Sequence, residues 1–159
     1  MDNKEIIIRA ENNPAVFARC AAMMASTDPW VRLGMDEPTC AAAFEGQGRE
    51  VYTVWVEDKL AGFVVLQMLG SFNGYVQTLL VADGYRGQGI SLRLLQFCEA
   101  YISKVSANMF ICVSAFNDRA RRIYERYGFE LVGVLKDFIK PGFDEWLLRK
   151  QIKRWEHEG

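Results

Sequence analysis

Apolar residues recur along the chain with two periods, and each period predicts one kind of element. Alternating or continuous apolar runs predict strands over residues 6–8, 51–56, 63–69, 75–81, 109–113, 130–135 and 145–148. Apolar residues spaced three and four positions apart predict helices over residues 14–24, 37–44, 94–105 and 117–127. This order predicts an α/β (α+β) fold with a mixed, mostly antiparallel sheet of about seven strands and about four flanking helices.

Local signals agree with these boundaries. Asn13 followed by Pro14 is a typical helix start, and Asp36 is a suitable capping residue for the second helix. Asn73 and Gly74 form a strong turn signal between two strands, and Gly128 is placed to end the last helix. No linker or repeat interrupts the pattern, so residues 1–159 are expected to form one domain.

Composition and charge narrow the function. The 159 residues carry a formal net charge of −1, half of them are apolar and a quarter are charged. This near-neutral balance gives no electrostatic reason to expect a nucleic-acid or membrane partner. The polar start of the chain does not resemble a signal peptide, so a cytoplasmic location is expected.

Cysteine and histidine usage argues against two kinds of site. No Cys-x-x-Cys pair occurs among Cys20, Cys40, Cys98 and Cys112, and the single histidine is His157. A zinc site is therefore not expected, and the cysteines are interpreted as reduced, mostly buried thiols. A catalytic triad is also disfavoured, because its base would have to come from the end of the chain.

A glycine-rich turn joins a predicted strand to a predicted helix at residues 81–91. Gly84, Gly87 and Gly89 follow the strand closely, so the backbone can approach a ligand there. The helix that follows directs free N–H groups at that ligand, which suits a pyrophosphate. The turn lacks the Lys of a Walker A loop, and Leu92 stands where a dinucleotide fingerprint needs its third glycine.

A second segment of interest covers residues 117–129. On a helix, Asn117, Ala120, Tyr124 and Tyr127 share one stripe, while three arginines fall on another. Taken alone, these residues have ordinary explanations: a helix cap, a core aromatic and a solvated face.

Together, the two segments resemble the signature of the GNAT (general N-acetyltransferase) superfamily. Its first part is Gln/Arg-x-x-Gly-x-Gly/Ala after the fourth strand, and Arg86, Gly89 and Ser91 stand at these positions. Its second part is matched by Asn117, Ala120, Tyr124, Gly128 and Phe129. Ser91 departs from the usual Gly or Ala, but it is small and keeps its N–H group.

The resemblance implies transfer of an acetyl group from acetyl-CoA, as co-substrate, to an amine by direct attack on the thioester. It implies that a backbone N–H near Leu80 polarises the thioester carbonyl and that Tyr124 protonates the departing thiolate. It also implies a cofactor site made of Leu79, Leu80, Val81, Arg86, Gly87, Gln88, Gly89, Ile90, Ser91, Asn117, Arg119 and Tyr124. The expected acceptor is a small-molecule or peptide amine.

The general base cannot be read from the sequence. Carboxylates near the expected acceptor side are Glu37, Glu45, Asp144 and Glu145, each expected to be a surface charge, and water could carry the proton instead. The acceptor side is expected to comprise residues 26–36 and 136–144, with a pocket lined by Trp30, Phe138 and Phe143. Acidic residues in and beside these segments suggest a cationic amine: Asp28, Asp36, Glu37, Asp144 and Glu145.

Two other functions remain open at this level. One is a non-catalytic domain that binds acyl-CoA as a sensor, and the other is a nucleotide-binding fold that uses the glycine-rich turn. A homodimer is also compatible with the sequence.

Overall fold

The computed structural model describes residues 4–152 of the chain. Seven strands form one mixed sheet, with the bounds β1 (Ile6–Glu11), β2 (Arg49–Val56), β3 (Lys59–Gln67), β4 (Tyr75–Val81), β5 (Asn108–Ser114), β6 (Glu130–Lys140) and β7 (Phe143–Gln151). Four α-helices accompany them, α1 (Pro14–Ala25), α2 (Glu37–Ala41), α3 (Ile90–Ile102) and α4 (Asp118–Tyr127), with short 3-10 turns η1 (Ala42–Phe44) and η2 (Asp83–Tyr85). No helix within the described residues is long and apolar enough to cross a membrane.

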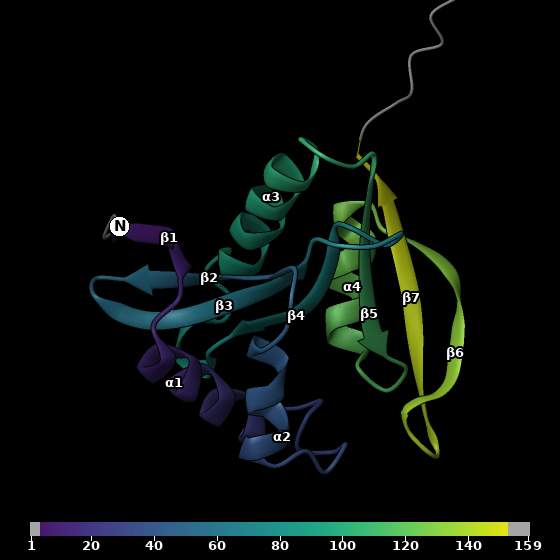
Figure 1. The fold of residues 1–159 in the computed structure, drawn as a ribbon, viewed down its shortest axis with the longest axis horizontal. Helices are drawn as coiled ribbons and strands as arrows, with labels where there is room; N and C mark the ends of the chain where they lie inside the picture. Colours follow the sequence, from purple (N-terminus) through teal and green to yellow (C-terminus); the bar gives the residue numbers. More distant parts are fainter. Residues whose placement is uncertain (1–3, 153–159) are drawn as a thin grey trace, which may run out of the picture.

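The sheet has the order β1-β2-β3-β4-β5-β7-β6 (Figure 1). All neighbouring strands are antiparallel except β4 and β5, which are parallel because α3 returns the chain between them. The prediction of a mixed, mostly antiparallel sheet of seven strands with four helices is therefore confirmed.

Two apolar layers cover the sheet, one on each face. On one face α1 and α2 pack over β2–β4 around Phe63, Val65 and Leu80, whereas on the other α3 and α4 pack around Val64 and Leu66. Side chains of β3 thus alternate between two cores, which explains why this strand is apolar throughout. The strand predicted over residues 63–69 begins earlier, at Lys59. Small residues precede Phe63, because a Cβ at Gly62 would lie 2.5 Å from the carbonyl oxygen of Leu80.

Several other boundaries differ from the sequence prediction, most clearly at the end of α3 and in the closing hairpin. The predicted third helix reached residue 105, but α3 ends at Ile102 and Val105 is exposed. The closing hairpin is longer than predicted, because β6 extends to Lys140 and β7 begins at Phe143. The pairing of β6 with β7 is irregular, and Asp137 has a positive φ of 52°. The alternation of apolar and polar residues that predicts a strand is therefore interrupted in the second half of β6.

Strands β4 and β5 pair only between the amino-terminal end of β4 and the middle of β5, and then separate. Tyr75 pairs with Phe110 and Val76 with Ile111, and no pairing between the two strands continues beyond them. On its other side β4 stays paired with β3, but the register shifts by one residue at Gln77, which makes a bulge. Because a bulge bends its strand, the carboxyl-terminal half of β4 turns away from β5 and the sheet opens between them (Figure 1).

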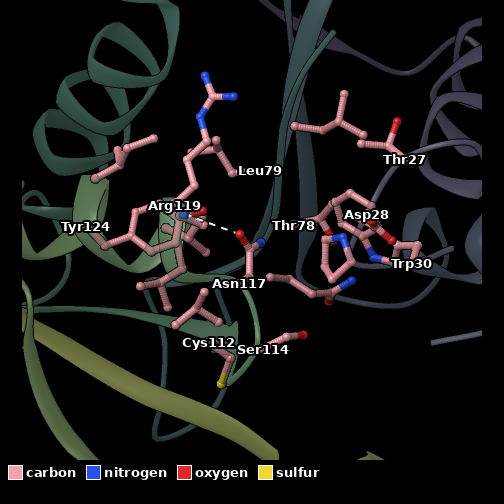
Figure 2. Close-up of a pocket in the computed structure, with 18 of the residues that line it drawn as sticks. Thr27, Asp28, Trp30, Thr78, Leu79, Cys112, Ser114, Asn117, Arg119 and Tyr124 are labelled. Atoms are coloured by element: carbon pink, nitrogen blue, oxygen red, sulfur yellow. Dashed lines mark hydrogen bonds between the residues drawn. The ribbon is translucent and has the colours of Figure 1, made fainter. Parts of the chain in front are cut away.

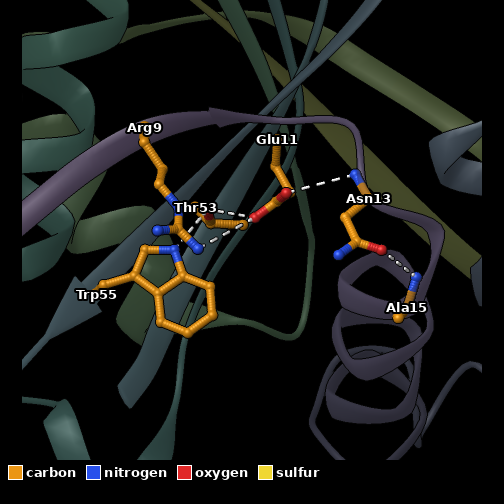
Figure 3. A network of polar contacts seen from close by, with 6 residues as sticks. All are labelled: Arg9, Glu11, Asn13, Ala15, Thr53 and Trp55. Carbon is orange, nitrogen blue, oxygen red and sulfur yellow. Dashed lines mark hydrogen bonds and ion pairs between the residues drawn. The ribbon is translucent and has the colours of Figure 1, made fainter. Parts of the chain in front are cut away.

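A polar network secures the sheet edge at β1 (Figure 3). The Thr53 hydroxyl lies 3.3 Å from Glu11 and accepts a hydrogen bond from the Trp55 indole at 2.8 Å, while the Arg9 guanidinium covers the Trp55 ring at 4.3 Å. Asn13 caps α1 by accepting a hydrogen bond from the N–H of Ala15. These contacts fix the start of α1 relative to β2, and every member has a partner within the network.

Candidate functional site

The opening between β4 and β5 is a cleft of ≈ 440 Å³. Its walls are the whole of β4, residues 111–114 of β5, the amino-terminal half of α4, and the loop of residues 26–30 after α1. A second hollow of ≈ 230 Å³ lies in front of the α3 amino terminus. The two hollows share Val81, Arg86, Ser91, Arg119 and Ile123, so they are parts of one elongated site.

The amino terminus of α3 provides backbone donors to this site. Gly87 and Gly89 have φ angles of 76° and 77°, a left-handed conformation that glycine adopts without strain. Gly89 is the N-cap and has no side chain, so it offers no acceptor to the first N–H groups of α3, which stay free to donate to a ligand. A Cβ at Gly87 or Gly89 would meet no atom within 4 Å, so open space lies in front of both.

Two arginines supply positive charge near these amides. Arg86 forms an ion pair with Asp83 at 2.9 Å, and its Nε donates a hydrogen bond to the carbonyl oxygen of Val81 at 3.4 Å. Arg119, in the first turn of α4, lines both hollows. Gln88, which the sequence placed in the cradle, lines neither hollow and instead donates a hydrogen bond to the carbonyl of Gly84 at 3.4 Å.

The backbone of β4 presents only every second amide to the cleft. The N–H of Ala82 donates to the carbonyl of Ala61 on β3, and Phe63 pairs with Leu80 two residues further along the same ladder. Because hydrogen-bonding direction alternates along a strand, the N–H of Leu80 also faces β3. The expectation that Leu80 supplies the polarising donor is therefore corrected. The amides that face the opening belong to Leu79 and Val81.

Tyr124 lines the cleft from α4 and is 7% exposed. Its ring packs edge-on against Phe129, with the centroids 6.0 Å apart. Burial, with a smaller effect from Cys98, raises the pKa of Tyr124 above that of an ordinary phenol. The hydroxyl therefore stays protonated at neutral pH, as a proton donor must. The side chain of Asn117 caps α4 by accepting a hydrogen bond from the N–H of Ala120 at 3.3 Å (Figure 2).

The side of the cleft that faces Tyr124 contains some, but not all, of the residues predicted to line the acceptor pocket. In Figure 2, Asp28 and Trp30 lie across the pocket from Tyr124, and Phe138 of β6 also lines the cleft. Phe143 does not, because it packs against Phe116 with the ring centroids 5.8 Å apart. Asp36 caps α2 by accepting a hydrogen bond from Thr39, and Asp144 accepts one from the backbone of Asp137.

One of the four carboxylates named on the expected acceptor side occupies an unexpected position. Glu37 and Glu45 are exposed and Asp144 is half-buried, but Glu145 is only 6% exposed and lines the cleft. Burial raises the pKa of Glu145, and the neighbouring Ser114 hydroxyl opposes this in part. The expectation that Glu145 is a surface charge was wrong, because β7 lies between β5 and β6 rather than at the sheet edge.

Within residues 4–152, no three His, Cys, Asp or Glu side chains gather into a possible metal site. The four cysteines are all free, three of them buried and Cys112 half-buried. His157 lies outside the described residues.

Comparisons with known proteins address the same segments. The model of the acetyltransferase (GNAT) family matches residues 17–129. An uncharacterized protein of Mycobacterium leprae (strain TN) is 30% identical over 160 residues, which cover 96% of the chain and 42% of that protein. The chain thus spans about two fifths of the length of this relative.

Solved structures show that the fold is shared. The ribosomal-protein-S18-alanine N-acetyltransferase of Escherichia coli superimposes with a TM-score of 0.76 and 18% identity, covering 98% of this chain and 99% of that one. An aminoglycoside 6'-N-acetyltransferase complexed with coenzyme A gives a TM-score of 0.74 and 15% identity, covering 94% and 99%. The family match spans β4, the glycine-rich turn and α4, which together build the cleft, and the chain therefore belongs to the acetyltransferase (GNAT) family.

Proposed function

We propose that the protein transfers the acetyl group of acetyl-CoA to an amine, by direct attack of the amine on the thioester. One observation carries this proposal: the α3 amino terminus, the free edge of β4 and Tyr124 all border one continuous opening. An anion cradle, a row of backbone donors and a protonated phenol are thus lined up along a single extended site.

The cradle fits the pyrophosphate of coenzyme A. The first amides of α3 and the backbone around Gly87 and Gly89 offer donors, and the open space before both glycines leaves room for an anion. Arg86 and Arg119 add positive charge at the junction of the two hollows. In this proposal, Gln88 supports the turn rather than the ligand.

The free edge of β4 fits the pantetheine arm. The amides of Leu79 and Val81 face the opening, where β5 has moved away and cannot accept their hydrogen bonds. The arm carries amide groups of its own, so it can pair with β4 as an additional strand would. The same two amides are the candidates to polarise the thioester carbonyl, which assigns this role to neighbours of Leu80 rather than to Leu80.

The chemical step then needs few groups. The amine nitrogen forms a bond to the thioester carbon, and the carbonyl oxygen becomes an oxyanion that backbone donors stabilise, an effect worth about 10²–10³ in rate for one donor. The carbon–sulfur bond breaks, and the thiolate takes the proton of the Tyr124 hydroxyl. Tyr124 regains a proton from the nitrogen, which must lose one to become an amide.

Ligand-induced shifts in melting temperature test the cofactor. Acetyl-CoA at about 100 times its dissociation constant should add roughly 2.7 kcal/mol to the free energy of unfolding, whereas NAD and ATP should add little. Stabilisation by NAD or ATP instead of acetyl-CoA would favour a nucleotide-binding function.

Release of the coenzyme A thiol, followed with a panel of primary amines, tests the activity. Panel members should include an amino-terminal peptide, a lysine peptide, a polyamine and an aminoglycoside, because the fold alone does not select among them. Tight acetyl-CoA binding without thiol release for any of them would favour a sensing domain.

Location and assembly complete the proposal. A cytoplasmic location is supported by four free cysteines, since a reducing compartment keeps thiols unpaired. A homodimer stays a prediction, which sedimentation equilibrium of the purified protein would test.

A further inference from the structure

A buried carboxylate on the acceptor side of the cleft, Glu145, has no oppositely charged partner among residues 4–152. Glu145 of β7 lies directly opposite Ser114 of β5 in the antiparallel ladder, and the two side chains are 6% and 3% exposed. The Oε2 atom of Glu145 and the Oγ atom of Ser114 are both buried and make no hydrogen bond of normal geometry among the described residues, although the Ser114 hydroxyl is near enough to lower the pKa of the carboxyl.

Such an arrangement is costly for the folded protein alone. A buried polar group without a partner costs about 1–3 kcal/mol, and a charged one costs more. No Lys or Arg within residues 4–152 forms an ion pair with Glu145, and no metal-binding cluster includes it. The negative charge of Glu145 acts on two neighbours, Tyr75 of β4 and Cys112 of β5, and burial together with this charge raises the pKa of each, so both stay neutral at pH 7 and neither offers Glu145 a positive charge.

The orientation of these side chains follows from the strand period. Ile111 and Val113 of β5 point into the core under α3 and α4, so Cys112 and Ser114 point to the opposite face of the sheet. Glu145, directly across from Ser114, shares that face. Tyr124 belongs to the core on the α3 and α4 face. Both Tyr124 and Glu145 nevertheless line the cleft, because the sheet is open between β4 and β5.

We propose that Glu145 binds the ammonium group of the acceptor and takes its first proton, an inference that rests on the proposed acetyl transfer. The ammonium nitrogen gives one proton to the Glu145 carboxylate and then attacks the thioester carbon with its freed electron pair. As the carbon–sulfur bond breaks, the nitrogen loses its second proton, which replaces the one Tyr124 gives to the thiolate. Glu145 releases its proton to solvent.

The surroundings of Glu145 also define the class of acceptor. Asp28 adds a negative charge at the cleft, and Trp30 and Phe138 offer aromatic surface there. A cation beside a carboxylate and aromatic rings is favoured electrostatically. The acceptor is therefore a primary alkylamine that arrives as an ammonium ion, with an apolar portion next to the nitrogen.

A pair of coenzyme A thioethers tests this without knowledge of the natural acceptor. S-(2-aminoethyl)-coenzyme A carries an ammonium group close to the position of the attacking nitrogen, and S-propyl-coenzyme A carries a methyl group in its place. Isothermal titration at pH 7.5 gives the ratio of their dissociation constants for wild type, Glu145→Gln and Asp144→Asn. Asp144 is the matched control, since it lies next to Glu145 on β7 with its side chain on the other face.

The proposal expects wild type to prefer the ammonium analogue, and this preference to fall at least tenfold in Glu145→Gln but to persist in Asp144→Asn. Both variants should bind S-propyl-coenzyme A within threefold of wild type, which shows that they fold and keep the cradle. An unchanged preference in Glu145→Gln, or an equal loss in Asp144→Asn, would overturn the role of Glu145. If S-propyl-coenzyme A did not bind wild type at all, the acetyl-CoA proposal itself would fall, and this inference with it.

Discussion

Tyr124 and Glu145 line the same cleft from opposite faces of the sheet. Tyr124 comes from α4, and Glu145 comes from β7 on the side where the loop after α1 also lies. A reaction centre placed between them would have a proton donor on one side and a proton acceptor on the other. Burial raises the pKa of both groups, which keeps the phenol protonated and brings the carboxyl closer to neutrality.

Replacing Tyr124 by Phe should slow catalysis without weakening cofactor binding. The ring and its contact with Phe129 are kept, so the variant should fold and bind acetyl-CoA nearly as well as wild type. With a responsive amine, kcat should fall by about 10²–10⁴, the usual contribution of general acid catalysis. The loss should shrink with an acyl donor whose leaving thiol is more acidic. An unchanged kcat, with chemistry shown to be rate-limiting, would return Tyr124 to a packing role.

The change Gly89→Glu should abolish acetyl-CoA binding and leave a folded protein. The new side chain has space, but it places a negative charge where the pyrophosphate is expected, and a φ of 77° costs about 1–2 kcal/mol for a residue other than glycine. Gly70→Glu is the control, because Gly70 has a φ of 83° and equal space but lies in the turn after β3. Titration calorimetry should show wild-type affinity for the control; normal binding by Gly89→Glu would remove the cradle assignment.

Coenzyme A should protect alternate amides of β4 from hydrogen exchange. The N–H groups of Leu79 and Val81 face the opening, so their hydrogen exchange should slow markedly when coenzyme A binds. The N–H of Leu80 is already paired to β3, so its exchange rate should change little. Residue-resolved exchange by NMR, with and without coenzyme A, measures this. Slower exchange at Leu80 with no change at Leu79 and Val81 would contradict this alternation of amide directions along β4.

Glu145→Gln should raise the melting temperature at neutral pH but not at acid pH. Folding raises the pKa of Glu145, so ionisation of its carboxyl lowers the free energy of unfolding. This loss of stability begins as pH rises through the pKa of the unfolded state, near 4.3, and is complete above the pKa of the folded state. A gain of about 1 kcal/mol corresponds to roughly 2–4 °C for a chain of this size. Thermal melts at pH 4 and pH 7.5 should therefore show the difference only at the higher pH. Destabilisation at pH 7.5 would mean that the carboxylate has a favourable partner.

The sequence was sufficient for elements whose signals are local. Residues 75–81 were predicted as a strand with the bounds that β4 has, and Asn13, Asp36 and Asn117 all cap helices as their residue types suggested. The glycine-rich turn and the α4 segment were also predictable as one site, because the resemblance specifies both motifs and their order. Their roles in binding and catalysis stay predictions.

The sequence was insufficient where a property depends on long-range pairing. Glu145 follows Asp144 at the tip of a hairpin, and nothing local distinguishes the two carboxylates. Only the insertion of β7 between β5 and β6 buries Glu145 against Ser114. The same holds for β4, where the direction of the Leu80 amide follows from its pairing with Phe63.

The separation of β4 from β5 divides the sheet into two sets of strands with little hydrogen bonding between them. Strand pairing between β1–β4 on one side and β5–β7 on the other is limited to Tyr75 and Val76, and the apolar core under α3 and α4 also spans the two sides. A ligand that pairs with the free edge of β4 and also contacts α4 would keep β4 and β5 apart and, at the same time, connect the two sets of strands. The two halves of the protein should accordingly unfold less independently of each other when that ligand is bound.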